Sequence, residues 1–115
     1  MAALALAAGA AHAEGDAARG EKLYVDCAAC HPLERGVHGI GPTLYDIIGR
    51  KASGYDDYRY SPALKRSGFT WTVEALDTFI ADPQASVPAN RMPYAGMPDA
   101  GDRADLIAYL QKQAK

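Results

Sequence analysis

Apolar residues recur along the chain at helical spacing, and this pattern predicts three main helices. The first helix begins after Asp16, whose side chain can cap it. Its apolar face holds residues three and four apart: Ala17, Gly20, Tyr24 and Cys27. Because Cys27 falls at the end of this helix, the helix should deliver it to the interior.

The second and third helices have equally local signals. Thr72 can cap a helix over Val73–Ala81, which Asp82-Pro83 ends. One stripe of that helix holds Val73, Leu76 and Ile80. Asp102 can cap a last helix, whose shared face holds Arg103, Leu106, Ile107 and Leu110.

Shorter helical turns are predicted between the first two of these helices. Residues 32–42 are rich in glycine and have no helical period, so they form a loop. Residues 44–48 then form a short turn of helix that Gly49 stops. Ser61-Pro62 opens another short helix that ends before Gly68.

The fold class that follows is all-α with long loops. No segment alternates with the period of two that strands require, and no internal repeat occurs. Residues 82–98 contain four prolines together with Met92 and Met97, a composition typical of an irregular loop at a site.

Size and charge limit the number of domains and the kind of partner, but they do not identify a function. A chain of 115 residues with 49% apolar content fits one domain. The formal charge is -2, and acidic and basic residues are interleaved, which argues against a nucleic-acid partner.

Residues 1–13 are predicted to be a signal peptide that is cleaved after Ala13. They contain no charged residue and end in Ala-His-Ala, a small-x-small pattern. The usual basic start is missing, so the segment is either a truncated signal peptide or an ordinary Ala-rich helix. It is too short to span a membrane, and no other apolar run reaches that length. Residues 14–115 are therefore expected to form one domain without a membrane span.

The strongest chemical signal is Cys27-Ala28-Ala29-Cys30-His31, which matches the C-x-x-C-H pattern of c-type haem attachment. Two thiols at this spacing can each add to one vinyl group on the same porphyrin edge. The adjacent imidazole can then bind the iron. One pentapeptide thus supplies both tethers and the proximal ligand.

Three other readings of the cysteine pair fit less well: a redox dithiol, half of a zinc site, and a disulfide. A thioredoxin-like motif needs a βαβ context. A zinc site would have to crowd Cys27, Cys30 and His31 into five residues, with His38 as the fourth ligand.

With this motif, the chain resembles the class I cytochromes c, the family that includes mitochondrial cytochrome c and its soluble bacterial relatives. The resemblance covers nearly all of residues 14–115 and keeps the family's order and spacing. The matching positions are Gly20, Tyr24, residues 38–42, 49–51, Tyr58, Tyr60, 68–71, Met92 and 103–110. It implies the family's fold, in which three main helices, short helices and long loops wrap around one covalent haem c.

The resemblance also implies roles for individual residues. Met92 matches the distal iron ligand and lies at the family's distance from Trp71. Met97-Pro98 is a second Met-Pro pair, so Met97 is a competing candidate for this ligand. The Pro42 carbonyl should accept a hydrogen bond from His31. His38 should bridge loops, and Gly20 with Tyr109 should form the crossing of the first and last helices. The residues that match the surroundings of a haem propionate are Arg50, Tyr60, Ser61 and Trp71.

The sequence departs from the mitochondrial proteins at two kinds of position. Leu64 and Phe79 stand where an amide and a phenol usually lie near the methionine sulfur. The lysine ring around the haem edge is largely absent: Asp26, Gln84 and Asp99 fall at or beside its positions, and Arg91 survives. We therefore expect weak electrostatic steering and a docking contact made mainly by an apolar patch over residues 92–97 that includes Tyr94.

The function that the resemblance implies is periplasmic single-electron transfer rather than catalysis. A peroxidase-like or ligand-binding haem protein is the enzyme-class rival, and it would need a vacant iron position. A dedicated subunit of one dehydrogenase is the third reading. We expect a monomer whose partners are redox proteins: membrane respiratory or photosynthetic complexes, or a periplasmic dehydrogenase.

Overall fold

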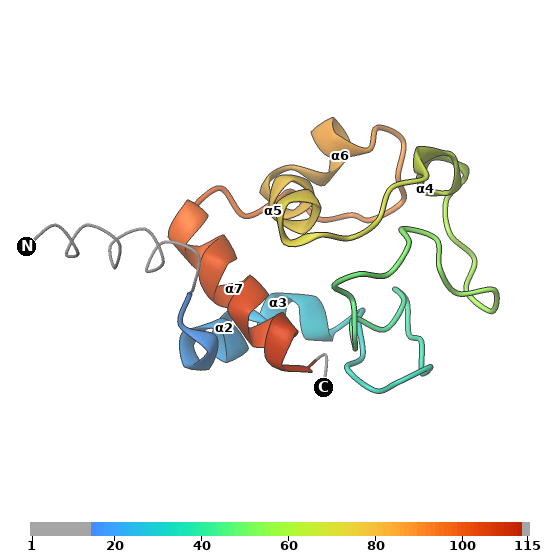
Figure 1. Cartoon of the computed structure of the whole chain (residues 1–115). Helices are drawn as coiled ribbons and strands as arrows, with labels where there is room; N and C mark the ends of the chain where they lie inside the picture. The colour runs from blue at the N-terminus through green and yellow to red at the C-terminus, as the bar shows by residue number, and fades with distance from the viewer. Residues whose placement is uncertain (1–14, 114–115) are drawn as a thin grey trace, which may run out of the picture.

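Helices at the two ends of the chain pack together, and the middle of the chain wraps beside them (Figure 1). The structure is a computed structural model that describes residues 15–113. The predicted signal peptide, with its cleavage after Ala13, lies outside the described residues. The helices are α2 (Ala17–Leu23), α3 (Val25–Ala28), α4 (Pro62–Ser67), α5 (Val73–Ala81), α6 (Pro83–Ser86) and α7 (Ala100–Gln113).

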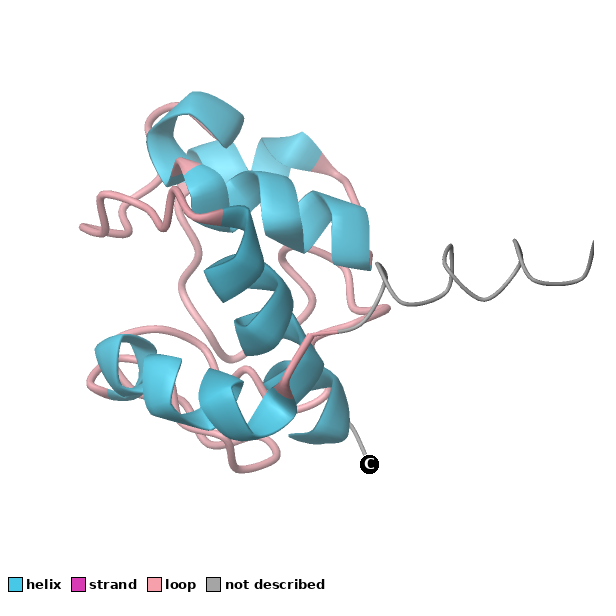
Figure 2. Cartoon of the chain, turned by 90° about the vertical axis from the view of Figure 1, so that its left-hand side faces the viewer, coloured by secondary structure: helices cyan, strands magenta, loops and turns pink. Residues whose placement is uncertain are grey.

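The all-α prediction is confirmed for the described residues. Figure 2 shows helices and loops over this part of the chain. Its only β-type pairing is an isolated antiparallel bridge between Lys51 and Thr70. Within residues 15–113, no helix has the length and apolar character needed to cross a membrane.

Helix starts that depend on a capping side chain lie where the sequence predicts them. The Asp16 carboxylate accepts hydrogen bonds from the Ala18 and Arg19 amides at 3.0 and 3.2 Å, which begins α2. Ser61 and Thr72 cap α4 and α5 in the same way. Helix α6 was not predicted, because Asp82-Pro83 indicated only the end of α5. In the structure Asp82 also caps the short helix that follows, with Pro83 at its first position.

The helical turn predicted at residues 44–48 is wrong, since the structure has only turns there. Asp46 adopts a left-handed φ of 61°, which interrupts a right-handed helix. Side chains bind the backbone instead: the Tyr45 amide donates to Thr43 Oγ1 at 3.0 Å, and Arg50 donates to the carbonyls of Thr43 and Tyr45.

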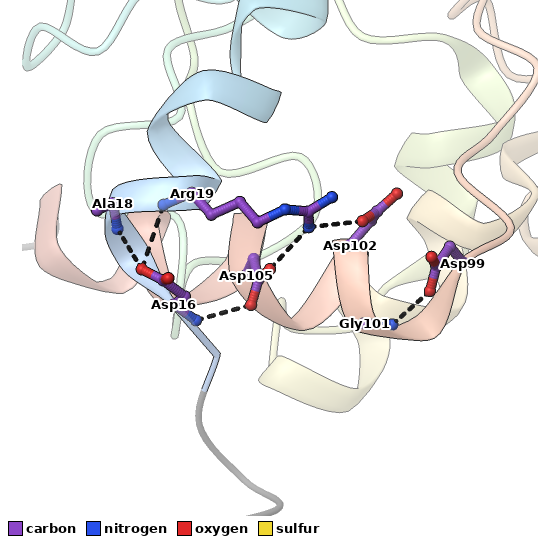
Figure 3. Close-up of polar contacts among 7 residues, drawn as sticks. All are labelled: Asp16, Ala18, Arg19, Asp99, Gly101, Asp102 and Asp105. Atoms are coloured by element: carbon purple, nitrogen blue, oxygen red, sulfur yellow. Dashed lines mark hydrogen bonds and ion pairs between the residues drawn. The ribbon is translucent and has the colours of Figure 1, made fainter.

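The predicted cap of the last helix is also wrong, because α7 begins at Ala100, before Asp102. The carboxylate at the helix start belongs to Asp99, which accepts a hydrogen bond from the Gly101 amide at 2.8 Å. Asp102 lies within the first turn and accepts from Arg19 Nη1 at 2.6 Å. Both contacts are drawn in Figure 3.

The crossing of α2 and α7 brings together the two ends of the described chain. A Cβ atom added to Gly20 would overlap the Asp105 carbonyl and lie 2.9 Å from the Tyr109 Cβ, so only glycine allows this approach. The Tyr24 and Tyr109 rings pack at 5.7 Å beside it. Arg19 adds ion pairs to Asp102 and Asp105 at 2.6 and 2.8 Å, as Figure 3 shows. The expected pairing of Gly20 with Tyr109 is confirmed.

Candidate functional site

A cavity of about 600 Å³ opens between the helices and the long loops. Helices α5 and α7 contribute apolar walls, and further lining comes from residues 26–31, 40–52, 58–64, Trp71 and 90–94. The fully apolar part of the lining includes Leu44, Ile47, Leu76, Ile80, Leu106 and Leu110. The volume lies within the range of cofactor sites, roughly 300–1,000 Å³.

Both cysteines line this cavity from α3 and the turn that follows it. The amides of Cys30 and His31 donate to the Cys27 carbonyl at 3.1 and 2.9 Å, so a tight helical turn sets the spacing of the three side chains. Cys27 and Cys30 are free and half-buried. Burial raises the pKa of the Cys27 thiol to about 11, so this thiol is protonated at neutral pH.

The His31 ring is held in one orientation at the cavity wall. Its Nδ1 lies 2.7 Å from the Pro42 carbonyl oxygen, and its own carbonyl accepts a hydrogen bond from the Tyr24 hydroxyl. Burial lowers the pKa of His31, so the imidazole is neutral at pH 7. Because the Pro42 carbonyl can only accept, Nδ1 has the proton and Nε2 retains a lone pair that can bind a metal.

The two candidate methionine ligands lie in different surroundings. Met92 is half-buried and lines the cavity that His31 and the cysteines also line. Met97 is 7% exposed, belongs to the hydrophobic core, and is not part of the cavity lining among the described residues. Its amide donates to the Ile80 carbonyl at 2.8 Å, which ties it to the end of α5.

Thr43 is the main structural residue near this site that the sequence did not single out. It is completely buried. Its hydroxyl donates to the Pro32 carbonyl at 3.0 Å, its amide donates to His38 Nδ1 at 3.2 Å, and its carbonyl accepts from Arg50. Nothing in the local sequence marks this role, because the partners come from three separate segments.

His38 bridges two loops, as predicted. Besides accepting from Thr43, it pairs through Nε2 with Asp57 Oδ1 at 3.0 Å, and its ring meets Tyr55 edge-on at 4.6 Å. It is not among the residues that line the cavity in the described part of the chain.

All four predicted propionate residues line the cavity: Arg50, Tyr60, Ser61 and Trp71. Tyr60 accepts a hydrogen bond from the Tyr55 amide at 3.1 Å, and Ser61 accepts from the Leu64 amide at 3.1 Å. A hydroxyl that accepts in this way still has its own proton to donate. Arg50 is fixed by the carbonyls of Thr43 and Tyr45 and brings a positive charge to the wall.

Comparison with known proteins agrees with this geometry. The family model for cytochrome c matches residues 17–114. The chain belongs to the class I cytochromes c. A cytochrome c2 of Rhodomicrobium vannielii is 38% identical over 104 residues, which span 90% of this chain and 83% of that protein. A cytochrome c of Tetrahymena pyriformis is 44% identical over 99 residues, which span 85% and 89%.

The solved structures include a similar cytochrome as well. Cytochrome cH from Methylobacterium extorquens matches with a TM-score of 0.80 and 45% identity, over 85% of this chain and 99% of that one. The class I cytochrome c fold is therefore confirmed. Membership of this family supports a haem-containing electron carrier, and it implies covalently bound haem c.

Two of the positions at which this cytochrome departs from its mitochondrial relatives face the cavity. Leu64 and Phe79 both line it, and the Phe79 ring meets Trp71 edge-on at 5.1 Å. The cavity therefore has apolar side chains at the two positions where the family resemblance implies that an amide and a phenol are replaced.

The rim of the cavity includes the exposed residues Asp26, Ile40, Arg59 and Arg91, and the half-buried Tyr94 lines the cavity as well. Ile40 is 76% exposed, and the sequence did not single it out for docking. Met97 was expected within the docking patch, and this is wrong because its side chain is buried in the core. The apolar part of the rim consists of the exposed Ile40 and the half-buried Met92 and Tyr94.

Proposed function

We propose that this cytochrome is an exported carrier of single electrons, with one haem c joined to Cys27 and Cys30 and ligated by His31 and Met92. The proposal rests on one observation. Two thiols, a neutral imidazole and a thioether reach the same apolar cavity, while the competing Met97 lies in the core.

The cavity suits a haem in its size and in its donor set. Each of the two thiols can add S–H across a vinyl double bond, which forms a thioether without net oxidation. The imidazole has its proton on Nδ1, which leaves Nε2 for iron. Arg50, Tyr60 and Ser61 offer a charge and hydroxyl protons where a buried carboxylate would need them.

Haem c bound there would supply an iron that gains or releases one electron. The chain's own residues determine how well that exchange proceeds. Pro42 and Tyr24 keep His31 in place, so that little has to move when the charge changes. A thioether from Met92 would favour the ferrous state, and Met92 and His31 together would occupy the positions at which a substrate could otherwise bind. The apolar walls exclude water from the site.

The location that fits this chemistry is the periplasm. As the family resemblance implies, covalent haem attachment in bacteria occurs on the outer side of the cytoplasmic membrane. We therefore assign residues 1–13 to a signal peptide cleaved after Ala13, with residues 14–115 as the mature cytochrome domain. Its partners would be redox proteins that meet the rim of the cavity.

Intact mass and absorption spectra of the purified protein test the proposal. The protein is expressed with cytochrome maturation machinery, alongside a Cys27→Ala/Cys30→Ala double variant. We expect the mass of one haem on the wild-type chain, retained after denaturation, and none on the double variant. A bare polypeptide mass for the wild type would contradict the proposal.

A further inference from the structure

The turn that precedes Met92 has an unfavourable backbone conformation. Ala89 adopts a left-handed φ of 71°, a region in which residues with a Cβ atom are rarely found. Neither a helix nor a strand includes residues 87–99. One backbone hydrogen bond, from the Asn90 amide to the Val87 carbonyl at 3.2 Å, closes the turn, and the other bonds around it come from side chains.

The Asn90 side chain makes three hydrogen bonds around the turn. Its Nδ2 donates to the carbonyls of Pro83 and Val87, both at 2.9 Å, which ties the turn to α6. Its Oδ1 accepts from the Met92 amide at 2.8 Å. One amide group therefore connects the helix before the turn to the backbone of the methionine after it.

Gln84 closes the same turn from the other side. Its Oε1 accepts from the Ala89 amide at 3.2 Å, and its Nε2 donates to the Asn90 carbonyl at 2.9 Å. Gln84 is exposed and does not line the cavity, so it acts on the site through these two hydrogen bonds to the turn. The side-chain amides of Gln84 and Asn90 thus bind the backbone before and after Ala89 and stabilise its unfavourable conformation.

We propose that Asn90 and Gln84 are positioning residues for Met92, and that together they set how often its sulfur leaves the iron. This inference rests on the proposed role of Met92 as the distal ligand. Without the two amides, the left-handed turn would relax and Met92 would spend more time away from the iron. An added ligand that competes for the vacated position would then bind more tightly in proportion to the open fraction.

Imidazole binding to the ferric holoprotein measures that open fraction directly. The variants are Asn90→Ala, Gln84→Ala and Asn90→Asp, which keeps the acceptor for the Met92 amide but loses the donors to α6. The loss of these hydrogen bonds should tighten imidazole binding by roughly tenfold for Asn90→Ala and roughly fivefold for Gln84→Ala. Asn90→Asp should lie between Asn90→Ala and the wild type.

Two controls separate positioning from general loss of stability. Arg19→Ala breaks the ion pairs between α2 and α7, so it should lower the unfolding midpoint and leave imidazole affinity unchanged. Gln111→Ala repeats the glutamine change at an exposed position on α7 and should alter neither quantity. Because Gln84 is exposed, its variant remains informative even if Asn90→Ala does not fold.

Each result has a definite meaning. Imidazole affinities within twofold of the wild type for both Asn90→Ala and Gln84→Ala would overturn the positioning role, and so would an equal tightening in Arg19→Ala. A wild-type protein that lacks the far-red sulfur-to-iron band, and binds imidazole as tightly as Met92→Ala, would instead overturn Met92 as the ligand.

Discussion

Gly41 lies directly against the imidazole of His31, and a Cβ atom added to the glycine would come within 2.7 Å of the ring Nδ1. That contact is shorter than any real Cβ approach, so Gly41→Ala should push the ring or the Pro42 carbonyl out of place. We expect a free energy of unfolding lower by about 1–3 kcal/mol and a shifted reduction potential in the holoprotein.

The matched control is Gly101→Ala, at an exposed position in the first turn of α7. A Cβ atom there would lie 3.4 Å from the Asp99 carboxylate, which is an ordinary contact. Chemical denaturation and potentiometry of both variants check the prediction. Equal behaviour of the two would show that the His31 contact is not tight.

Met92→Ala should abolish the far-red sulfur-to-iron band of the ferric protein and give it weak peroxidase activity, because an open iron position admits peroxide. Met97→Ala is expected to keep the band, since Met97 is buried in the core. It should instead lower the free energy of unfolding by about 2–5 kcal/mol, as large-to-small core changes do. If the band survived in Met92→Ala and vanished in Met97→Ala, the ligand assignment would be wrong.

Thr43→Val should destabilise the loops around the site while preserving side-chain shape. The change removes a completely buried hydroxyl that donates to the Pro32 carbonyl and accepts from the Tyr45 amide. Leaving those two groups without their partner should cost about 1–3 kcal/mol of unfolding free energy. The same change at the exposed Thr78 of α5 should cost less than about 0.5 kcal/mol. Denaturant titration of both variants makes the comparison.

The contribution of Asp105 to stability should depend on pH. The Asp16 amide and the Arg19 guanidinium lower the pKa of this carboxyl below its ordinary value of 3.8. A group with a lower pKa in the folded state stabilises the fold above its ordinary pKa, and this contribution is lost as the pH falls through the folded value. Asp105→Asn should therefore unfold at a lower temperature than the wild type near neutral pH.

The gap in melting temperature between these two proteins should shrink below pH 4 and vanish once Asp105 is protonated in both states. Asp56→Asn, at an exposed loop position, should leave the melting temperature of the wild type unchanged throughout. Thermal unfolding across the acid range tests this, and a gap that is constant with pH would exclude a charge effect at Asp105.

Docking to a redox partner should depend more on apolar contact than on charge. The chain has 12 basic and 14 acidic residues, and its cavity rim mixes both signs. The bimolecular electron-transfer rate should therefore vary little with ionic strength. Ile40→Ser at the rim should lower that rate about threefold to tenfold. Val25→Ser is the control, since Val25 is 69% exposed on α3 and does not line the cavity.

A several-hundredfold fall in rate between low and high salt would place the docking charges elsewhere. Equal effects of the Ile40 and Val25 variants would likewise argue against the rim as the contact surface.

Local signals explain why much of the helical structure was predictable from the sequence. Thr72 bonds to an amide three residues away, and Asp16 does the same, so their roles are encoded within one turn. Asp99 and Asp102 show the limit of that reasoning. Both could cap α7, and the distant Arg19 engages Asp102 as an ion-pair partner instead.

The parts of the site that sequence reasoning missed depend on contacts between separate segments. Thr43 meets partners from residues 32, 38 and 50, and no pattern around residue 43 indicates this. Asn90 acts through Pro83 and Val87, which become neighbours only because α6 forms in a stretch that looks irregular. The cysteines and His31 were predicted because haem attachment requires a fixed spacing, and Met92 was predicted from its match to the family's ligand position; the structure places all four at one cavity.

The cavity has a consequence for how this protein is made in the cell. Its walls are largely apolar, and apolar surface left in contact with water adds nothing to the stability of the fold. Domains of this size are stable by only about 5–15 kcal/mol. If haem c covers these walls, as we propose, polypeptide and haem are expected to fold as a single unit. On that proposal, attachment to Cys27 and Cys30 would come before the chain closes around the porphyrin, because both thiols are half-buried in the folded protein.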